Sequence, residues 1–347
     1  MKKFLIASDS FKGTLSSQEI GEIFSKKCQN IFPDSKVIIV PVADGGEGTV
    51  HALKNFLKGK LIKVNSLGPN KQKLKGTYLI KGKDAYVEVA SSCGLSLAKP
   101  PNPMITTSYG SGLEILHAIK QGAKHIFIGL GGSSTNDGGA GILNALGVKF
   151  LDKNNQEFLP VGNSLNQISD FNIDQLRKNI KGIKFTLLSD VTNPFTGSKG
   201  ASKIFAKQKG ANQKQIEILE NNMKYFAKII SQKLNQNINK IPGAGAAGGI
   251  GGGLFAFLNA EIKSGVKTIL EIINFNKLIK GCDFVFTGEG KLDSQSFDGK
   301  LISGVLSFTK KQKIPTIAIC GTIDKNLPKN YLQKFGLYKA FASSPTN

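Results

Sequence analysis

The chain has 347 residues, of which 40% are hydrophobic and 20% are charged, the composition of an ordinary globular protein. The formal net charge of +22 suggests nucleic-acid binding, but arginine occurs only as Arg177 and the lysines form no long block, which argues against it. No run of about eighteen uncharged apolar residues is present, and the apolar run after Lys3 is too short for a signal peptide, so we expect a cytoplasmic protein without a membrane span.

The first sixty residues show the pattern of two β-α units. Residues 4–7 are a short apolar strand, and the Ser/Thr residues that follow are typical of a helix start. The apolar positions of that helix have helical spacing: Ile20, Ile23, Phe24, Cys28 and Ile31. Residues 35–42 form a continuous apolar run, which indicates a buried parallel strand, and residues 48–57 predict a second helix.

From residue 63 to Cys93 the hydrophobic pattern alternates, which predicts a hairpin with its turn at residues 81–83. The next predicted elements are a helix at 111–121, a strand at 125–132, a helix after Asp137, a strand at 184–191 and a long amphipathic helix at 213–234. Near Cys282 the β-α alternation returns and continues to about residue 343. We therefore predict an α/β protein in which both chain ends, residues 1–62 and 276–347, form one domain and residues 63–275 form an inserted α/β domain.

Cysteines and histidines give no sign of a metal centre. The cysteines are far apart and form no CxxC pair, so we expect buried free thiols at Cys28, Cys93, Cys282 and Cys320. The histidines lack a zinc-binding spacing and are interpreted as structural or surface residues: His51, His117 and His125.

Five predicted strands end with glycine beside an acid or a hydroxyl. These segments are "SDSFKGT", "PVADGGEGT", "GLGGSSTNDGGAG", "LSDVTNPFTG" and "FTGEGKLDSQSFDGK". In open parallel sheets, ligands bind outside the carboxyl ends of the strands, where small residues give access to backbone N–H groups. Turn formation is the alternative explanation for any one segment. Five such segments together favour a ligand site.

The segment at 129–141 has the features of a phosphate cradle, because it places backbone donors and hydroxyls between a strand and a helix. Its candidate residues are Gly131, Gly132, Ser133 and Ser134. It is not a Walker A loop, since no Lys-Ser/Thr follows the glycines. "GAGAAG" at 243–248 matches G-x-G-x-x-G without a preceding apolar strand, so we interpret residues 243–253 as a loop before a tightly packed helix. Its glycines, Gly245 and Gly248, are candidates for close approach to a nucleotide.

Carboxylates also lie at the predicted strand ends: Asp44, Glu47, Asp190, Glu289 and Asp293. Helix capping is the alternative role for each of them. Together with Lys12 and the glycine loop, they supply what phosphoryl transfer requires: oxygen ligands for Mg²⁺, a cation for the transferred group and a base for the attacking hydroxyl.

Seven blocks of the sequence resemble the bacterial glycerate kinase family, in order and from Met1 to about Phe341. They are "SDSFKGTLSS", "PVADGGEGT", "GLGGSSTNDGGAGILNALG", "SDVTNPFTG", "GAS…FAKQKGA", "PGAGAAGG" and "TGEGKLDSQSFDGK". Ser8 stands where members of that family usually have Pro, and the family pattern continues beyond "FASSPTN" into a final helix.

The resemblance implies transfer of the γ-phosphate of ATP to D-glycerate, giving 2-phosphoglycerate or 3-phosphoglycerate, in a cleft between a Rossmann-like parallel-sheet domain and the inserted domain. We assign Asp190 as the general base, and Asp44 with Glu289 or Asp293 to Mg²⁺, although any of these carboxylates fits either role. Ser10, Lys12, Asn136 and Asp137 are expected to bind the substrate. Lys12 is also assigned to catalysis.

Three other interpretations stay open at this point. In the first, the acceptor is another small hydroxy acid, because a few pocket contacts decide which acceptor a kinase uses. In the second, the protein is a non-catalytic basic binder of nucleic acid or of acidic partners. In the third, the protein is an oxidoreductase acting on glycerate. This interpretation requires a dinucleotide-binding motif directly after a strand, and the sequence has none. Neither the monomeric nor the homodimeric state is specified by the sequence.

Overall fold

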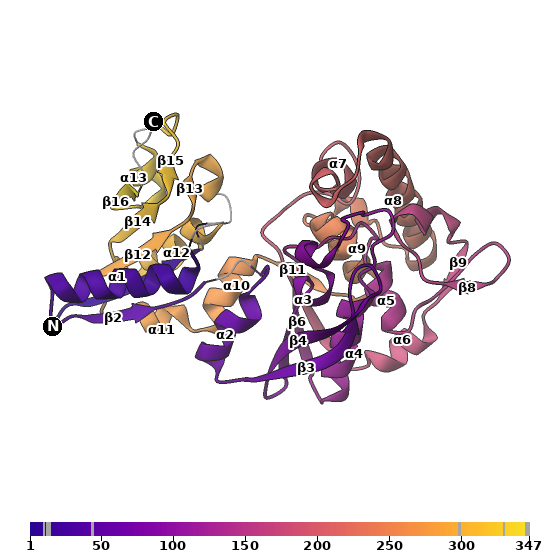
Figure 1. Ribbon diagram of the computed structural model, residues 1–347, viewed down its shortest axis with the longest axis horizontal. Coiled ribbons are helices and arrows are strands. Elements are labelled where there is room, and N and C mark those ends of the chain that lie inside the picture. Colours follow the sequence, from indigo (N-terminus) through magenta and orange to yellow (C-terminus); the bar gives the residue numbers. More distant parts are fainter. Residues whose placement is uncertain (10, 12–14, 43–44, 298–299, 329, 344–347) are drawn as a thin grey trace. The chain divides into compact units, whose positions relative to one another are not determined.

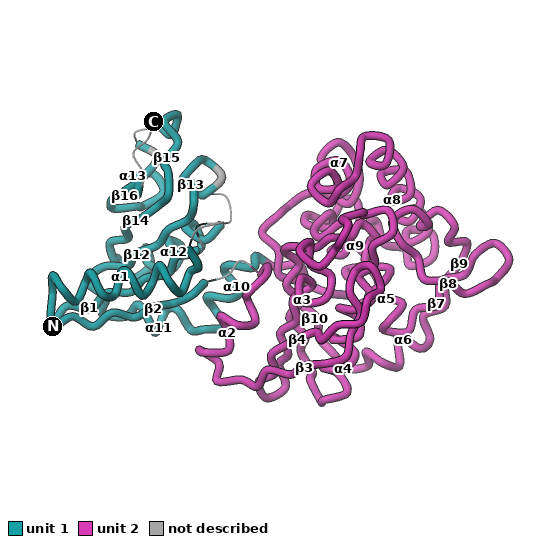
Figure 2. Tube along the Cα trace, in the orientation of Figure 1, with its two compact units in different colours: residues 1–44, 264–347 teal, residues 45–263 magenta. Residues whose placement is uncertain are grey.

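The computed structural model describes residues 1–347 apart from residues 10, 12–14, 43–44, 298–299, 329 and 344–347. The chain divides into two compact units, which Figure 2 shows in teal and magenta. Unit 1 consists of both chain ends, residues Met1–Asp44 and Ser264–Asn347, and unit 2 consists of residues Gly45–Lys263.

Unit 1 is built on a parallel five-stranded sheet with the strand order β16-β14-β12-β1-β2 (Figure 1). In chain order, its strands are β1 (Lys3–Ser8), β2 (Lys36–Ile39), β12 (Phe284–Gly288), β14 (Thr316–Cys320) and β16 (Lys339–Ala342), with the short pair β13 (Lys291–Leu292) and β15 (Thr322–Ile323). Its helices are α1 (Ser17–Ile31), α10 (Gly265–Ile272), α11 (Phe275–Ile279), α12 (Leu301–Thr309) and α13 (Tyr331–Phe335). The buried strand β1 lies between β12 and β2 with Ser8 opposite Gly288, so the carboxyl ends of β1 and β12 are neighbours.

Helix α1 begins with a capping box, as its Ser/Thr-rich start predicts. The backbone N–H of Glu19 donates to Ser16 Oγ at 3.2 Å, and the N–H of Ser16 donates to Glu19 Oε2 at 2.8 Å. The predicted apolar face is buried only in part. Cys28 is buried, whereas Ile23 and Ile31 remain 51% and 70% exposed, respectively.

Unit 2 is built on a mixed six-stranded sheet with the strand order β11-β10-β6-β5-β4-β3. These strands are β3 (Lys60–Leu67), β4 (Lys73–Lys81), β5 (Asp84–Glu88), β6 (His125–Gly129), β10 (Lys184–Leu188) and β11 (Glu261–Lys263). Strand β4 is antiparallel to β3 and β5, and the other neighbours are parallel. The predicted hairpin is confirmed, because Lys81 pairs with Asp84 across a turn in which Gly82 has a φ of +60°.

The other elements of unit 2 are its helices and the strands of a small antiparallel sheet with the order β8-β7-β9. They are α2 (Thr49–Leu57), α3 (Ala90–Cys93), α4 (Tyr109–Lys120), α5 (Ala140–Ala145), β7 (Lys149–Leu151), β8 (Glu157–Phe158), β9 (Asp170–Asn172), α6 (Asp174–Asn179), α7 (Ala201–Phe205), α8 (Gln213–Leu234) and α9 (Ala246–Leu258). Short 3₁₀ segments lie at Leu95–Leu97, Gly162–Gln167, Lys207–Lys209 and Ile238–Lys240 in unit 2, and at Ser294–Phe297 and Lys310–Gln312 in unit 1.

Helix α8 has the predicted bounds, and its periodic apolar positions explain its place in the core. A capping box between Asn212 and Gln215 fixes its start. Its residue Phe226 is fully buried and packs edge-on against Phe150, which also contacts Phe257 of α9. This aromatic contact joins α8, α9 and β7 in one hydrophobic core.

The boundaries between the units lie at 44/45 and 263/264, whereas the sequence analysis placed them at 62/63 and 275/276. The first predicted boundary falls inside β3, which pairs with β4 along its whole length. Helix α2 is tied to the same sheet, since the N–H groups of Gly48 and Val50 donate to the carboxylate of Glu88 at the end of β5. At the second boundary, α10 and α11 pack against α12 and therefore belong to unit 1.

The predicted α/β class is confirmed, and so is the state of the cysteines. All four are buried free thiols. In the part of the chain that the structure describes, no helix is both long and apolar enough to cross a bilayer.

Glu114 of α4 is an unexpected charge in the core of unit 2. It is fully buried, and neither carboxyl oxygen has a hydrogen-bond partner among the described residues. The carboxyl group lies against the backbone of β4, where a Cβ atom at Gly76 would be 2.1 Å from Glu114 Oε1. Burial raises the pKa of Glu114 to about 8; the nearby hydroxyls of Ser92 and Ser91 oppose this rise, and the negative charge of Glu88 adds to it. Glu114 is therefore mainly protonated at neutral pH.

We expect Glu114→Gln to stabilise the protein at pH 8 and to have little effect at pH 5. The folded state binds more protons than the unfolded state between the ordinary pKa of 4.5 and about 8, so wild-type stability falls as the pH rises through this range. The neutral amide does not lose stability in this way. Calorimetry should show a thermal midpoint raised by about 5 °C or more at pH 8. The control is Glu157→Gln on the exposed β8, and an equal shift at both pH values would contradict the assignment.

Candidate functional site

The predicted site residues separate into two groups, one in each unit. Unit 2 holds Glu47, Gly131, Gly132, Ser133, Ser134, Asn136, Asp137, Asp190, Gly245 and Gly248. Unit 1 holds Glu289 and Asp293. Ser10, Lys12 and Asp44 lie outside the residues that the structure describes.

In unit 2, three of the glycine-containing segments meet at the carboxyl ends of β6 and β10. Gly129 is opposite Leu188 in the parallel register, and the N–H of Leu130 donates to the carbonyl of Leu188 at 3.1 Å. The N–H of Gly131 points to the carbonyl of Gly45 at 3.4 Å. The loops that begin at residues 130, 189 and 45 are therefore neighbours, as expected for a ligand site on a parallel sheet.

Gly245 and Gly248, at the start of α9, are required because another backbone segment lies against each of them. A Cβ atom at Gly248 would lie 2.0 Å from the carbonyl oxygen of Thr135, and one at Gly245 would lie 2.2 Å from that of Pro194. The N–H of Gly138 donates to the carbonyl of Gly248 at 3.1 Å. Gly248 also has a φ of +69° in an irregular first turn of α9, and both Gly245 and Gly248 are buried. A tightly packed helix is present as predicted, but the predicted loop at 243–253 is too long, because α9 begins at Ala246 and includes most of it.

Gly132 differs from these packing glycines. It is exposed and has a φ of +77°, and the nearest atom to a Cβ there would be the side chain of Ala90 at 3.4 Å. Its carbonyl accepts from the N–H of Leu95 at 2.9 Å. Gly132 therefore presents backbone to solvent in a left-handed conformation that glycine adopts without strain.

Asp137 holds the starts of α4 and α5. One carboxylate oxygen accepts from the N–H and the hydroxyl of Ser108 at 2.8 and 2.7 Å and from the N–H of Gly141 at 3.3 Å, and the other accepts from the N–H of Gly139 at 3.1 Å. Burial raises the pKa of Asp137, and these donors act in the opposite direction. Because the side chain is fully buried, the geometry favours a structural role over contact with a substrate.

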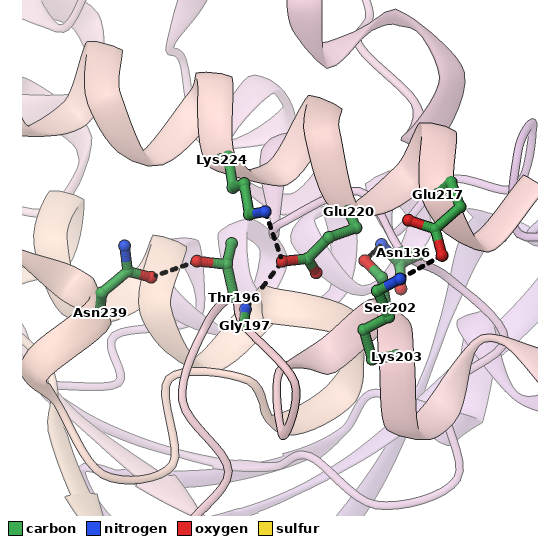
Figure 3. A network of polar contacts seen from close by, with 9 residues as sticks. All are labelled: Asn136, Thr196, Gly197, Ser202, Lys203, Glu217, Glu220, Lys224 and Asn239. Carbon is green, nitrogen blue, oxygen red and sulfur yellow. Dashed lines mark hydrogen bonds and ion pairs between the residues drawn. The ribbon is translucent and has the colours of Figure 1, made fainter.

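Asn136 is buried beside α7. Its amide nitrogen donates to Ser202 Oγ at 3.1 Å, and its Oδ1 has no partner among the described residues (Figure 3). The same figure shows how α8 fixes α7 and the loop before it. Lys203 pairs with Glu217, and the buried Glu220 accepts from the N–H of Gly197 at 2.7 Å.

Lys209 is a site residue that the sequence analysis missed. It is only 3% exposed, and its ammonium group donates to Ser133 Oγ at 2.9 Å and to the carbonyl of Thr135 at 2.7 Å. Burial lowers the pKa of Lys209 to about 7, and the negative charge of Asp137 opposes this effect. Ser134 faces away from this cation, since its hydroxyl donates to the carbonyl of Cys93 at 2.8 Å.

Among the predicted site acids of unit 2, Asp190 and Glu47 are more accessible than Asp137. Asp190 is half-buried, directly after β10, where the N–H of Ser189 donates to the carbonyl of Lys263 at 2.9 Å. Glu47 is exposed and lines a cavity of about 380 Å³. The cavity is also lined by Gly48, Val50, His51, Lys75, Thr77, Glu88, Ala90, Ser91, Ser96 and Leu97.

In unit 1, Glu289 and Asp293 follow β12. Burial raises the pKa of Glu289; the hydrogen bond of Ser296 and the charge of Lys300 oppose this rise, and the negative charges of Asp293 and Asp9 add to it. Glu289 Oε1 is buried without a partner among the described residues. Excess negative charge and a free carboxylate oxygen fit a hard cation such as Mg²⁺, which needs only one or two protein carboxylates. Within the described ranges, no group of three His, Cys, Asp or Glu residues is placed to hold a metal.

We expect Gly248→Ala to destabilise unit 2 more than Gly182→Ala does. Both glycines have positive φ, +69° and +73°, so each alanine introduces backbone strain of about 1–2 kcal/mol. A Cβ atom at Gly182 meets nothing within 4 Å, whereas at Gly248 it overlaps the Thr135 carbonyl, which adds about 1–3 kcal/mol. Thermal unfolding of the two variants provides the comparison. Equal midpoints would show that contact between the loops does not limit residue size at Gly248.

Comparison with known proteins agrees with the sequence resemblance. The profile of the family described as "Glycerate kinase family" matches residues 4–347. Glycerate 2-kinase of Escherichia coli (strain K12) is 43% identical over 325 residues, which are 92% of this chain and 85% of that protein. A glycerate kinase of Bacillus cereus is 40% identical over 348 residues, with coverage of 99% and 91%. The crystal structure described as glycerate kinase 2 from Salmonella typhimurium LT2 has a TM-score of 0.85 and 35% identity, covering 98% of this chain and 90% of that one. The chain therefore belongs to the glycerate kinase family.

Proposed function

We propose that this protein transfers the γ-phosphate of ATP to D-glycerate and forms 2-phosphoglycerate. Family membership supports the kinase activity and the acceptor, and the similarity to the Escherichia coli protein named glycerate 2-kinase supports the position of transfer. The observation that carries the proposal is the meeting of the Gly132 loop with the loop of Asp190 at adjacent carboxyl ends of β6 and β10. This arrangement places backbone donors and a carboxylate on the same edge of one sheet.

In the proposed reaction, the 2-hydroxyl of glycerate attacks the γ-phosphorus. A bond forms between the hydroxyl oxygen and phosphorus, the bond between phosphorus and the β-γ bridging oxygen breaks, and ADP leaves. Asp190 accepts the hydroxyl proton, since it is half-buried and more accessible than Asp137. The loop of Gly131, Gly132 and Ser133 binds phosphoryl oxygens through its donors.

Glu289 and Asp293 would hold Mg²⁺, which supplies neutralisation of phosphate charge when it is bound. The buried free oxygen of Glu289 and the surrounding negative charge are the support for this assignment. Asp44 as a further ligand, and Ser10 and Lys12 as substrate-binding groups, remain in the proposal on the grounds of sequence alone. Asn136 remains a candidate for substrate binding because its Oδ1 is buried without a partner in the described part of the chain.

The test of this function is the identity of the product. The protein is incubated with ATP, Mg²⁺ and D-glycerate, and the products are identified by phosphorus NMR against standards of both phosphoglycerates. We expect ADP and 2-phosphoglycerate. Exclusive 3-phosphoglycerate would contradict the position of transfer, and the absence of any phosphoglycerate would contradict the activity. Parallel incubations with glycolate and lactate test for another hydroxy acid as acceptor.

We expect Asp190→Asn to lower kcat by about a hundredfold or more, because the amide cannot accept the hydroxyl proton. The matched control is Asp34→Asn, which removes the same charge at an exposed position of unit 1. Steady-state kinetics with both substrates saturating measures the effect. An Asp190→Asn enzyme within a few-fold of wild type would remove Asp190 from the role of base.

A further inference from the structure

Lys209 is a buried cation whose described hydrogen-bond partners are neutral. In the described ranges, no carboxylate lies within 4.0 Å of its ammonium group. Its two acceptors are the hydroxyl of Ser133 and the carbonyl of Thr135. A lysine that is 3% exposed is normally paired with an anion, because removing its charge from water is costly. The position therefore needs an explanation beyond packing.

The bond from Lys209 determines which way the Ser133 hydroxyl can donate. A serine hydroxyl carries one proton and two lone pairs, and an ammonium group is only a donor. Ser133 Oγ therefore accepts from Lys209, and its own proton must point to a different acceptor. Among the described residues, Ser133 Oγ donates to no protein group, although the side chain is only 6% exposed.

Two backbone donors lie beside this hydroxyl. No carbonyl among the described residues accepts from the N–H groups of Gly132 and Ser133, whereas the opposite side of the loop is fixed by bonds from Leu95 to Gly132 and from Ser134 to Cys93, both 2.9 Å. Gly132 is exposed. The Ser133 hydroxyl and the backbone N–H groups of Gly132 and Ser133 are thus candidate donors beside an exposed glycine.

We propose that Lys209 is a positioning residue for a phosphoryl group: it occupies a lone pair of Ser133 Oγ and thereby directs the Ser133 hydroxyl, together with the N–H groups of Gly132 and Ser133, toward an anionic phosphoryl oxygen. The phosphoryl group belongs to the nucleotide or to the phosphorylated product. The inference rests on the proposed function, and it adds a residue and a mechanism that the sequence motif of the loop does not contain.

Electrostatics around Lys209 agree with this role. Burial holds the pKa of Lys209 at about 7, and Asp137 is the one charged group in the described chain whose field is seen to act on it. A bound phosphoryl anion would act in the same direction as Asp137 and favour the protonated lysine. Linkage then requires that the contribution of Lys209 to phosphoryl binding is greatest below pH 7 and declines as the pH rises above it.

The experiment compares Lys209→Met, Ser133→Ala and the double variant with wild type, and uses Lys207→Met as the control. Lys207 is exposed two residues earlier in the same segment, so its replacement makes the same change in net charge without the buried contacts. Titration calorimetry measures binding of AMP-PNP with Mg²⁺ and, separately, of 2-phosphoglycerate, at pH 6 and pH 8.5. Thermal midpoints recorded for all proteins identify variants that have lost the fold.

We expect Lys209→Met and Ser133→Ala each to weaken binding of one of the two phosphoryl ligands by about ten- to a hundredfold, the effect of losing a hydrogen bond to a charged group. The double variant should be little weaker than either single variant, because the lysine acts through the serine. The ratio of wild-type to Lys209→Met affinity should fall from pH 6 to pH 8.5. The ligand that responds shows which phosphoryl group the loop holds.

Several results would overturn the inference. One is binding of both ligands by Lys209→Met as strong as by Lys207→Met, and another is additive effects in the double variant. A third is a change confined to the KM for glycerate, which carries no phosphoryl group. If Lys209→Met does not fold, Ser133→Ala and the pH dependence of wild-type binding decide. Absence of phosphoglycerate formation by wild type would contradict the proposed function alone, since phosphoryl binding is measured without turnover.

Discussion

The site in unit 2 depends on the contact between two backbone segments, in which the α9 segment has glycine at both points of closest approach. The loop after β6 and helix α9 approach so closely that a Cβ atom at Gly253 would lie 2.0 Å from the carbonyl of Gly138, as one at Gly248 would from that of Thr135. The Thr135 carbonyl that Gly248 accommodates is also an acceptor for Lys209. The glycines of α9 therefore set the position of a carbonyl that holds the buried lysine, and through the lysine they affect the Ser133 hydroxyl.

Buried charges are the second constraint on this unit. Asp137 accepts from four donors, Lys209 has two neutral acceptors, and both carboxyl oxygens of Glu114 are buried without a hydrogen bond among the described residues. Burial raises the pKa of Asp137 and of Glu114 and lowers that of Lys209. A fully satisfied carboxylate is a stable structural element, as the helix starts at Asp137 show. A buried cation whose two described acceptors are neutral has a different character, because no hydrogen-bonded partner offsets its charge. The hydrogen-bond partners of these three groups therefore indicate their roles better than burial alone does.

Much of the fold could be predicted from the sequence, because periodicity is a local property. The bounds of α8, the hairpin of β4 and β5 and the capped start of α1 all follow from patterns within single segments. The unit boundary at 44/45 could not be predicted in this way, since it depends on the pairing of β3 with β4 and on the contact of Glu88 with α2. For the site, the loops were identified by their residue types, whereas Lys209 was missed. A lysine in a basic chain has the ordinary appearance of a surface residue, and its only signal was its place in the block "FAKQKGA".

Glycine at a strand end therefore has more than one meaning in this protein. Gly129 and Gly131 accommodate the backbone of Gly45 and Gly46, and a Cβ atom at either would lie within 2.6 Å of it. Such glycines are needed whether or not a ligand binds. Gly132 has no comparable neighbour, and its neighbour Ser133 keeps a hydroxyl proton without an acceptor among the described residues. A glycine-rich loop alone indicates that another group approaches the backbone closely, and that group can be protein or ligand. Donors without a protein acceptor beside an exposed glycine indicate a ligand.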